Sequence, residues 1–317
     1  MVVRGRGDGA GDEARTRDIQ LGRLTLYRLS YSRPRLIRAY HEEPGSRPAR
    51  EPRALLRSGP DNGSVKLGKH LDFLGHATTV VELGGLRVLT DPVLRPHLAF
   101  LERQVDPIPP ERYAGTDVVV ISHLHWDHLD LPSLRRLGTA PTLVVPSGAG
   151  ELMRRNGFET VIEMVPGETA TLGDLRVTAT RAVHRGFRPP FGPDAPSLGF
   201  VLEDRDRRIY FAGDTDIFPE MADLGDLDLA LLPIWGWGPR LGPGHMDPYR
   251  AAEALKLLRP RVAVPIHWGT YWLRGGGHLL RSRLIHPPRE FAAYAAISAP
   301  DVQVAAALPG ERLERLR

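Results

Sequence analysis

Three histidines and one aspartate lie within six residues of the sequence, in the segment ISHLHWDHL at 121–129. The four side chains are His123, His125, Asp127 and His128. Imidazole and carboxylate groups are ligands for zinc and related metals. Alternate residues of an extended chain share a face, so His123 and His125 should point the same way, while the other two follow on a turn. The spacing therefore predicts a pair of metal ions, and the alternative is a histidine-rich surface loop held by hydrogen bonds.

Three more candidate ligands follow apolar segments later in the chain, namely His184, Asp214 and His267. Loops at strand ends are where rigid folds present functional side chains. A catalytic ion needs about three protein ligands and an open position. We therefore expect His123, His125 and His184 to hold a first ion, Asp127, His128 and His267 to hold a second, and Asp214 to bridge them. The cofactor prediction is two zinc ions per chain, with iron or manganese as alternatives because the same ligands accept all three metals.

The composition limits the classes of site and protein. The 317 residues include no cysteine, which excludes disulfides and thiolate metal ligands. A hydrophobic content of 42% is sufficient for a large core. The first residues lack the apolar run of a signal peptide, and no stretch is long and apolar enough to span a bilayer. We therefore expect a cytoplasmic protein.

Charge divides the chain into two parts. Residues 1–66 carry 14 Lys and Arg against 8 Asp and Glu, a net charge of +6, whereas the remainder carries 28 against 30, a net of −2. We interpret residues 1–65 as a basic N-terminal extension and linker, partly disordered, and residues 66–317 as one folded domain. The extension could contact an anionic membrane or nucleic acid, but its poor helical periodicity favours packing on the main domain or on an oligomer partner.

The order of the predicted elements indicates the fold class. Hairpin-connected strands come first, and strands then alternate with helices, a pattern that predicts an α/β fold. We expect four layers, an αββα sandwich of two mixed β-sheets flanked by helices. Strands are expected at 70–74, 79–83, 86–90, 117–121, 142–146, 160–164, 169–172, 175–181, 199–203, 208–212, 226–233, 262–266 and 302–307. Helices are expected at 131–137, 148–156, 248–258 and 288–298.

Several short motifs, taken together with this ligand order, resemble the metallo-β-lactamase superfamily. They are GHAT at 75–78, LTDPV at 89–93, FAGDT at 211–215, HMDP at 245–248 and PIHWGT at 265–270. These motifs are most similar to the branch that includes the N-acyl-phosphatidylethanolamine-hydrolysing phospholipase D and the ascorbate-6-phosphate lactonase. The resemblance covers about residues 66–310. It departs from the cysteine-containing β-lactamases, because Asp214 stands where they place a thiolate.

The resemblance implies a hydrolase that cleaves a phosphodiester, phospholipid-like or lactone/ester bond with a hydroxide held between the two metal ions. Asp127 and Asp214 would hold the ions and orient this hydroxide. Asp91 would accept a hydrogen bond from a ligand histidine. The resemblance also implies that His245 stabilises an oxyanion or protonates a leaving group, the alternative being a histidine that only bonds backbone at a helix start. His76 is expected to be structural or to support a ligand from outside the metal sites.

Further residues are candidates for substrate binding. Arginines near the ligands could clamp a phosphate, or could be ordinary solvated side chains, and tryptophans could line an apolar pocket or belong to the core. The candidates are Arg185, Arg188, Arg240, Trp235 and Trp237. The expected partner is a small-molecule or lipid-like substrate. A nucleic-acid-binding protein or nuclease that uses the basic extension is the alternative, and the net negative charge of the remaining chain argues against it.

Overall fold

The structure is a computed structural model, and it describes residues 57–58, 71–276 and 282–313. The predicted extension and linker lie outside the described residues, apart from the short strand β1 (Arg57–Ser58). This strand pairs antiparallel with β17 (Gln303–Ala305), which shows that part of the segment interpreted as a linker joins a sheet. No described helix combines the length and the apolar character that crossing a bilayer requires.

Two mixed β-sheets form the centre of the fold. The larger sheet has eight strands. In spatial order they are β1, β17, β15 (Val262–Ile266), β14 (Leu229–Pro233), β13 (Arg208–Phe211), β12 (Pro196–Glu203), β11 (Leu175–Arg185) and β10 (Thr169–Leu172). The second sheet has seven strands. They are β18 (Arg312–Leu313), β2 (Leu71–Gly75), β3 (Thr78–Leu83), β4 (Leu86–Thr90), β7 (Val118–Val120), β8 (Thr142–Pro146) and β9 (Val161–Met164).

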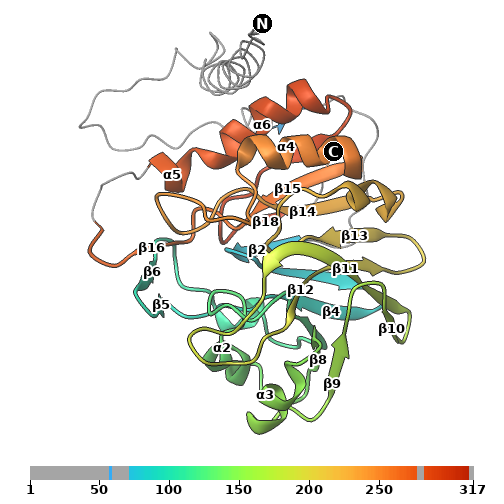
Figure 1. Cartoon of the computed structure of the whole chain (residues 1–317), viewed down its shortest axis with the longest axis vertical. Coiled ribbons are helices and arrows are strands. Elements are labelled where there is room, and N and C mark those ends of the chain that lie inside the picture. Colours follow the sequence, from blue (N-terminus) through green and yellow to red (C-terminus); the bar gives the residue numbers. More distant parts are fainter. Residues whose placement is uncertain (1–56, 59–70, 277–281, 314–317) are drawn as a thin grey trace, which may run out of the picture. The chain divides into compact units, whose positions relative to one another are not determined.

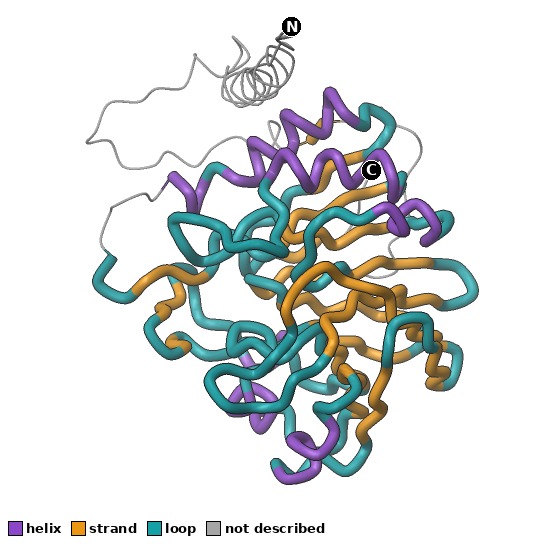
Figure 2. Tube along the Cα trace, viewed as in Figure 1, coloured by secondary structure: helices purple, strands orange, loops and turns teal. Residues whose placement is uncertain are grey.

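Helices cover the outer faces of both sheets, which confirms the predicted four-layer architecture. The eight-stranded sheet carries η4 (Pro219–Leu224), α4 (Pro248–Leu258), α5 (Ser282–Ile285) and α6 (Pro287–Ser298), and the seven-stranded sheet carries α2 (Leu131–Arg136) and α3 (Gly150–Arg155). Figure 1 shows α4 and α6 beside β14 and β15, and α2 and α3 at the other end of the molecule. Figure 2 shows the same separation, with strands between two groups of helices.

Strand β7 shows how the sequence builds these layers. Val118 and Val120 are buried in the core between the sheets, whereas Val119 and Ile121 are buried in the second core, beneath α2 and α3. Successive residues of a strand point to opposite faces, so an unbroken aliphatic run is what a sheet covered on both sides requires. Burying each such side chain contributes about 1.5–3 kcal/mol. The segment that leads into the metal-ligand motif is therefore rigidly held.

Parallel pairing brings the ligand-bearing loops together. In the seven-stranded sheet β7 runs parallel to β4 and β8, and in the larger sheet β13, β14 and β15 run parallel to one another. The carboxyl ends of parallel strands meet at one edge of a sheet, where α/β proteins bind their ligands. The loops that follow β7, β13 and β15 carry most of the predicted metal ligands.

Several features differ from the sequence-based expectation. A three-stranded sheet of β5 (His97–Leu98), β6 (Leu101–Arg103) and β16 (Tyr271–Leu273) was not predicted, because runs of two or three residues show no usable alternation. Strand β11 was expected to end at Arg181 but continues to Arg185 through an irregularity in its pairing with β12. His184 therefore lies within the end of a strand and not in the loop after it.

Candidate metal centre

The loop after β7 turns sharply and points its side chains inward. The backbone N–H groups of His128 and Leu129 both donate to the carbonyl oxygen of His125, at 3.1 and 2.8 Å. His128 is fully buried, while Asp127 and His125 retain some exposure. Helix α2 begins directly afterwards, where the Asp130 side chain accepts a hydrogen bond from Ser133 N. A buried strand and a capped helix therefore fix both ends of the ligand loop.

The first group of ligand atoms contains His123, His125 and His184. His125 Nδ1 lies 3.0 Å from His123 Nε2 and 3.1 Å from His184 Nε2. The outer nitrogen of each flanking ring is already engaged: His184 Nδ1 donates to the Gly244 carbonyl at 2.9 Å, and His123 Nδ1 lies 3.0 Å from Ser122 Oγ. These contacts turn both Nε2 atoms toward His125. The loop after β7 in one sheet and the end of β11 in the other thus meet at His125.

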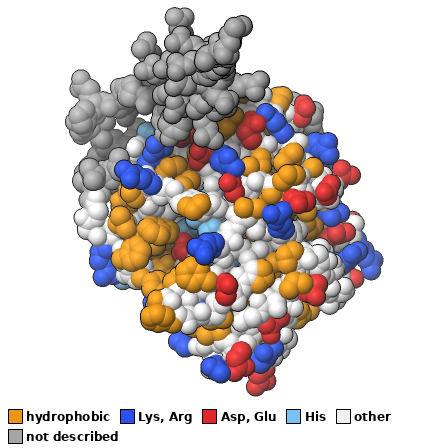
Figure 3. All heavy atoms as spheres, viewed as in Figure 1, with side chains coloured by type: hydrophobic (Ala, Val, Ile, Leu, Met, Phe, Trp, Pro, Cys, Tyr) orange, Lys and Arg blue, Asp and Glu red, His pale blue; other side chains and the backbone are white. Residues whose placement is uncertain are grey.

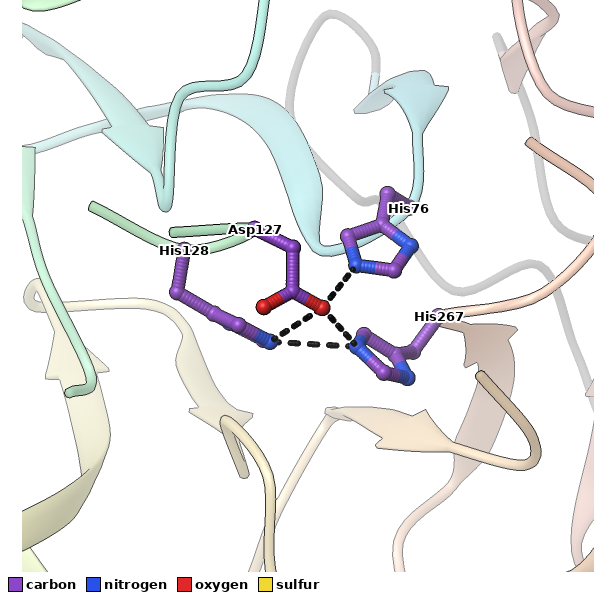
Figure 4. A group of neighbouring side chains, drawn as sticks. All are labelled: His76, Asp127, His128 and His267. Carbon is purple, nitrogen blue, oxygen red and sulfur yellow. Dashed lines mark hydrogen bonds and ion pairs between the residues drawn. The ribbon is translucent and has the colours of Figure 1, made fainter. Parts of the chain in front are cut away.

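The second group contains His76, Asp127, His128 and His267 (Figure 4). His128 Nε2 and His267 Nε2 are 3.1 Å apart, and each faces Asp127 Oδ2, at 3.8 and 3.7 Å. His76 Nε2 lies 3.0 Å from the same oxygen. The outer nitrogen of His267, Nδ1, donates to the Trp235 carbonyl at 2.8 Å. The carbonyl can only accept, so neutral His267 presents a lone pair on Nε2.

Asp214 lies between the two groups. Its Oδ2 is 3.1 Å from His128 Nε2 and 3.3 Å from His245 Nε2, and its Oδ1 is 3.3 Å from His267 Nε2. Ligand atoms of His184, Asp214 and His245 also lie within 4.8 Å of one another. One carboxylate therefore reaches the histidines of both groups, which is the place that a bridging ligand requires.

The residue before Asp214 must be glycine. Gly213 has φ +59°, and a Cβ there would lie 2.5 Å from the Ser122 Cβ and 2.8 Å from the Leu198 carbonyl oxygen. Glycine adopts this backbone conformation without strain and leaves room for the neighbouring chain. Close packing of the strand that carries Asp214 against the ligand loop depends on it.

Burial keeps most of the histidines neutral and their neighbours keep the carboxylates ionised. Burial lowers the pKa of His76 to about 3, that of His184 to about 4, and that of His123 well below its ordinary value. Burial alone would raise the pKa of Asp127 and Asp214, but the surrounding histidines hold both well below the usual range. Neutral imidazole and ionised carboxylate are the forms that bind metal ions.

The donor set fits metal ions in both groups. His125 Nδ1 carries at most one proton, so it cannot donate to both facing Nε2 atoms, and at least one of them receives no hydrogen bond from His125. In the second group, burial lowers the pKa of His128, but Asp214, Asp127 and Asp91 together raise it well above its ordinary value. Asp214 Oδ1 is buried and has no hydrogen-bond partner among the described residues. A bound cation would displace the proton of His128 and would give the facing nitrogen and carboxylate atoms a partner.

Asp91 supports the ligand loop from outside the two groups. Its Oδ2 accepts from His128 Nδ1 at 2.6 Å and from Ser122 Oγ, and its Oδ1 accepts from Ser122 N at 2.7 Å. Ser122 Oγ in turn contacts His123 Nδ1. One buried carboxylate therefore orients a histidine of each group, as the role expected for Asp91 requires.

The structure places His76 closer to the metal centre than the sequence analysis expected. Its ring is buried and faces Asp127 directly, so it can act as a further ligand of the second group as well as a support for the carboxylate. A signal was present in the sequence, because His76 directly follows the strand β2 (Leu71–Gly75) as His267 directly follows β15.

The residues expected to bind substrate occupy different environments. Arg185 and Arg240 are exposed, and their role stays a prediction. Arg188 instead donates through Nη1 to the carbonyl oxygens of Leu124 and Leu129, so this nitrogen is engaged with the protein's own backbone.

The two tryptophans differ in a similar way. Trp235 is buried and its Nε1 donates to the Gly238 carbonyl. Trp237 reaches the metal centre, where its Nε1 donates to Asp127 Oδ2 at 3.1 Å. Of the two, Trp237 is the one that lies at the site.

Comparison with known proteins agrees with the fold. A family model for the beta-lactamase superfamily domain matches residues 86–268. A metal-dependent hydrolase of Opitutus terrae is 35% identical over 254 residues, which cover 77% of this chain and 99% of the relative. An N-acyl-phosphatidylethanolamine-hydrolyzing phospholipase D of Caenorhabditis elegans is 32% identical over 237 residues, which cover 67% of each chain.

A solved structure leads to the same family. A metallo hydrolase from the archaeon Ignicoccus hospitalis superimposes with a TM-score of 0.61 at 27% identity, covering 78% of this chain and 98% of that one. The resemblance noted from the sequence motifs is thereby confirmed. The chain belongs to the metallo-β-lactamase superfamily, and within it to the metal-dependent hydrolases.

Proposed function

We propose that the protein is a dinuclear zinc hydrolase that cleaves a phosphodiester bond, or a carboxylic ester bond such as that of a lactone, in a small or lipid-like substrate. The observation that carries the proposal is the convergence of two histidine groups on the one carboxylate of Asp214. Iron or manganese are the alternative metals, because imidazole and carboxylate ligands accept each of them.

Each part of the centre has a separate role in the proposed hydrolysis. Zinc ions bound in the two groups would supply Lewis acidity and a nucleophilic water at neutral pH. Asp127 and Asp214 are held ionised, so they can bind the ions and accept a hydrogen bond from the attacking water. The carbonyl groups of Trp235 and Gly244 keep the rings of His267 and His184 in position. The chain therefore presents a preorganised site in which little has to move during the reaction.

His245 is placed to donate a proton. Burial lowers its pKa, but the hydrogen bond and the charge of Asp214 outweigh this and raise the pKa to about 9. In the metal-free protein the ring is therefore protonated at neutral pH, and a protonated Nε2 facing the centre can donate to a leaving-group oxygen or to a developing oxyanion. Its Nδ1 is held by the carbonyl oxygens of Gly242 and Pro243, so Nε2 is the atom left to face the reaction.

Exposed aromatic side chains beside the metal centre support an apolar part in the substrate. Phe187 is 38% exposed and contacts the ring of His125 edge-on, with centroids 5.7 Å apart. Phe100 is 51% exposed and contacts Trp237 in the same way at 5.3 Å. Figure 3 shows histidine atoms in a hollow of this face, with hydrophobic side chains around it. The phospholipase D relative hydrolyses a lipid, as its name states, which is in keeping with such a rim.

A chromogenic substrate panel tests the proposal. The zinc-loaded protein is expected to hydrolyse bis(p-nitrophenyl) phosphate or an aliphatic lactone, and to act on β-lactams poorly. Within the active class, kcat/KM should rise with the length of an attached alkyl chain, because the aromatic rim buries apolar surface. The His184→Ala variant, which lacks a ligand of the first group, is the control for hydrolysis that does not depend on the site. Activity confined to β-lactams, or no activity above this control, would contradict the proposal.

A further inference from the structure

Arg188 makes an unusual pair of contacts with the metal-ligand loop. It lies between β11 and β12, four residues after His184. Its Nη1 donates to the carbonyl oxygen of Leu124 at 3.1 Å and to that of Leu129. Leu124 stands between the first two histidines of the ligand motif, and Leu129 directly follows the last. A single nitrogen atom therefore ties the two sides of the ligand segment together.

Backbone hydrogen bonds join the same two segments. Leu124 N donates to the Gly186 carbonyl at 3.2 Å, and Leu198 N donates to the Ser122 carbonyl at 2.9 Å. The β11–β12 connection is itself closely packed at this point, since a Cβ on Gly186 would lie 2.5 Å from the Ala195 carbonyl oxygen. The ligand loop follows the seven-stranded sheet, whereas these partners belong to the eight-stranded sheet and its β11–β12 connection. The contacts thus link the sheets beside the metal centre.

This link determines the geometry of the first group. His123 and His125 come from one sheet and His184 from the other, so their mutual distances depend on how the two sheets are joined here. A guanidinium group is planar and always charged, and hydrogen bonds from charged donors are stronger than those between neutral groups. Arg188 is partly buried beside the loop, which limits competition from water for the two carbonyl oxygens.

We propose that Arg188 is a positioning residue, which clamps the ligand loop against β11 and thereby sets the geometry of the first metal group. The inference rests on the proposed metal centre, but it assigns the guanidinium a role distinct from binding a substrate phosphate. Groups that orient metal ligands from outside the coordination shell typically contribute 10–100-fold to metal affinity. The loss should fall mainly on the first group, because all three of its ligands lie on the two segments that Arg188 joins. The second group also includes His76 and His267, which follow β2 and β15.

Metal retention tests the assignment without relying on turnover. Zinc-loaded wild type, Arg188→Met and Arg188→Lys are dialysed against increasing concentrations of a chelator, and zinc per chain is counted by mass spectrometry. Arg188→Met should lose one of two ions at a chelator concentration about 10–100-fold lower than wild type. Arg188→Lys retains the charge and should be intermediate. Arg176→Met, an exposed arginine at the start of β11, is the matched control and should behave as wild type.

The outcomes separate the inference from its alternatives. Equal zinc retention in all four proteins overturns the inference. An Arg188→Met variant in which only the KM for a phosphodiester rises would also overturn it, because that result would indicate substrate binding. A fall in the melting temperature of the metal-free protein with unchanged retention would show a purely structural role and also overturn it. If Arg188→Met does not fold, the comparison of Arg188→Lys with wild type decides. A wild type that binds no zinc would instead overturn the proposed function itself.

Discussion

The Asp214→Asn variant is expected to lose at least about 100-fold in kcat/KM. Removing a group that only orients a metal ligand costs up to about 100-fold, and replacing a bridging ligand should cost at least as much. Asp214 Oδ2 lies 3.1 Å from His128 Nε2, and Oδ1 lies 3.3 Å from His267 Nε2. Oδ1 is buried, and no described residue forms a hydrogen bond with it. Asparagine has the same size but lacks the negative charge, and its NH₂ group cannot bind a cation. Activity on the preferred substrate of the panel and zinc per chain should be measured on the same preparations.

A nearby carboxylate provides the control for this variant. Asp216 lies two residues further along the chain, and its Oδ1 accepts from Arg250 Nε at 2.6 Å instead of facing the histidines. Asp216→Asn should therefore retain both ions and change kcat/KM by only a few-fold. If Asp214→Asn binds two ions and turns over like wild type, Asp214 is not a bridging ligand.

The second large effect is expected from Asp91→Ala, which should destabilise the metal-free protein by about 3 kcal/mol. Asp91 is fully buried, and its carboxyl group accepts hydrogen bonds from His128 Nδ1 and from both the N–H and Oγ of Ser122. Alanine leaves these buried donors without a partner. Chemical denaturation of the metal-free variant should show the loss of stability, and a zinc-binding titration should show affinity about 10–100-fold weaker.

Ser122→Ala serves as a graded comparison for Asp91→Ala. It removes only the hydroxyl that joins Asp91 to His123, while the Ser122 N–H continues to donate to the carboxylate. Its effects on stability and on zinc affinity should therefore both be smaller. Equal stability of Asp91→Ala and wild type would show that the carboxylate does not hold the ligand loop.

The architecture and the candidate ligand motif could be predicted because each rests on a local pattern. The four apolar residues 118–121 lead into the ligands of the 121–129 motif, and strands of this kind must be covered on both faces. The neighbours of His184 and His267 could not be predicted. Their Nδ1 atoms donate to the carbonyl oxygens of Gly244 and Trp235, which are backbone atoms and carry no residue signature.

The role of Arg188 also could not be predicted from the sequence. An arginine four residues after a candidate metal ligand suggests phosphate binding, because a guanidinium group suits a phosphate. Its contacts with the carbonyl oxygens of Leu124 and Leu129 depend on the close approach of two sheets and an extended β11, neither of which a single sequence reveals. The contacts of this side chain are therefore determined by long-range packing and not by its residue type.

Counting metal ions in the wild type and in one variant from each group tests whether two ions bind at these residues. After loading with zinc and exhaustive dialysis, wild type should retain two ions per chain by mass spectrometry. His184→Ala should retain the ion of the second group, and His267→Ala the ion of the first, because the groups draw these ligands from different strands. A wild type that retains no zinc, iron or manganese, or variants that retain as much metal as wild type, would contradict a dinuclear centre at these residues.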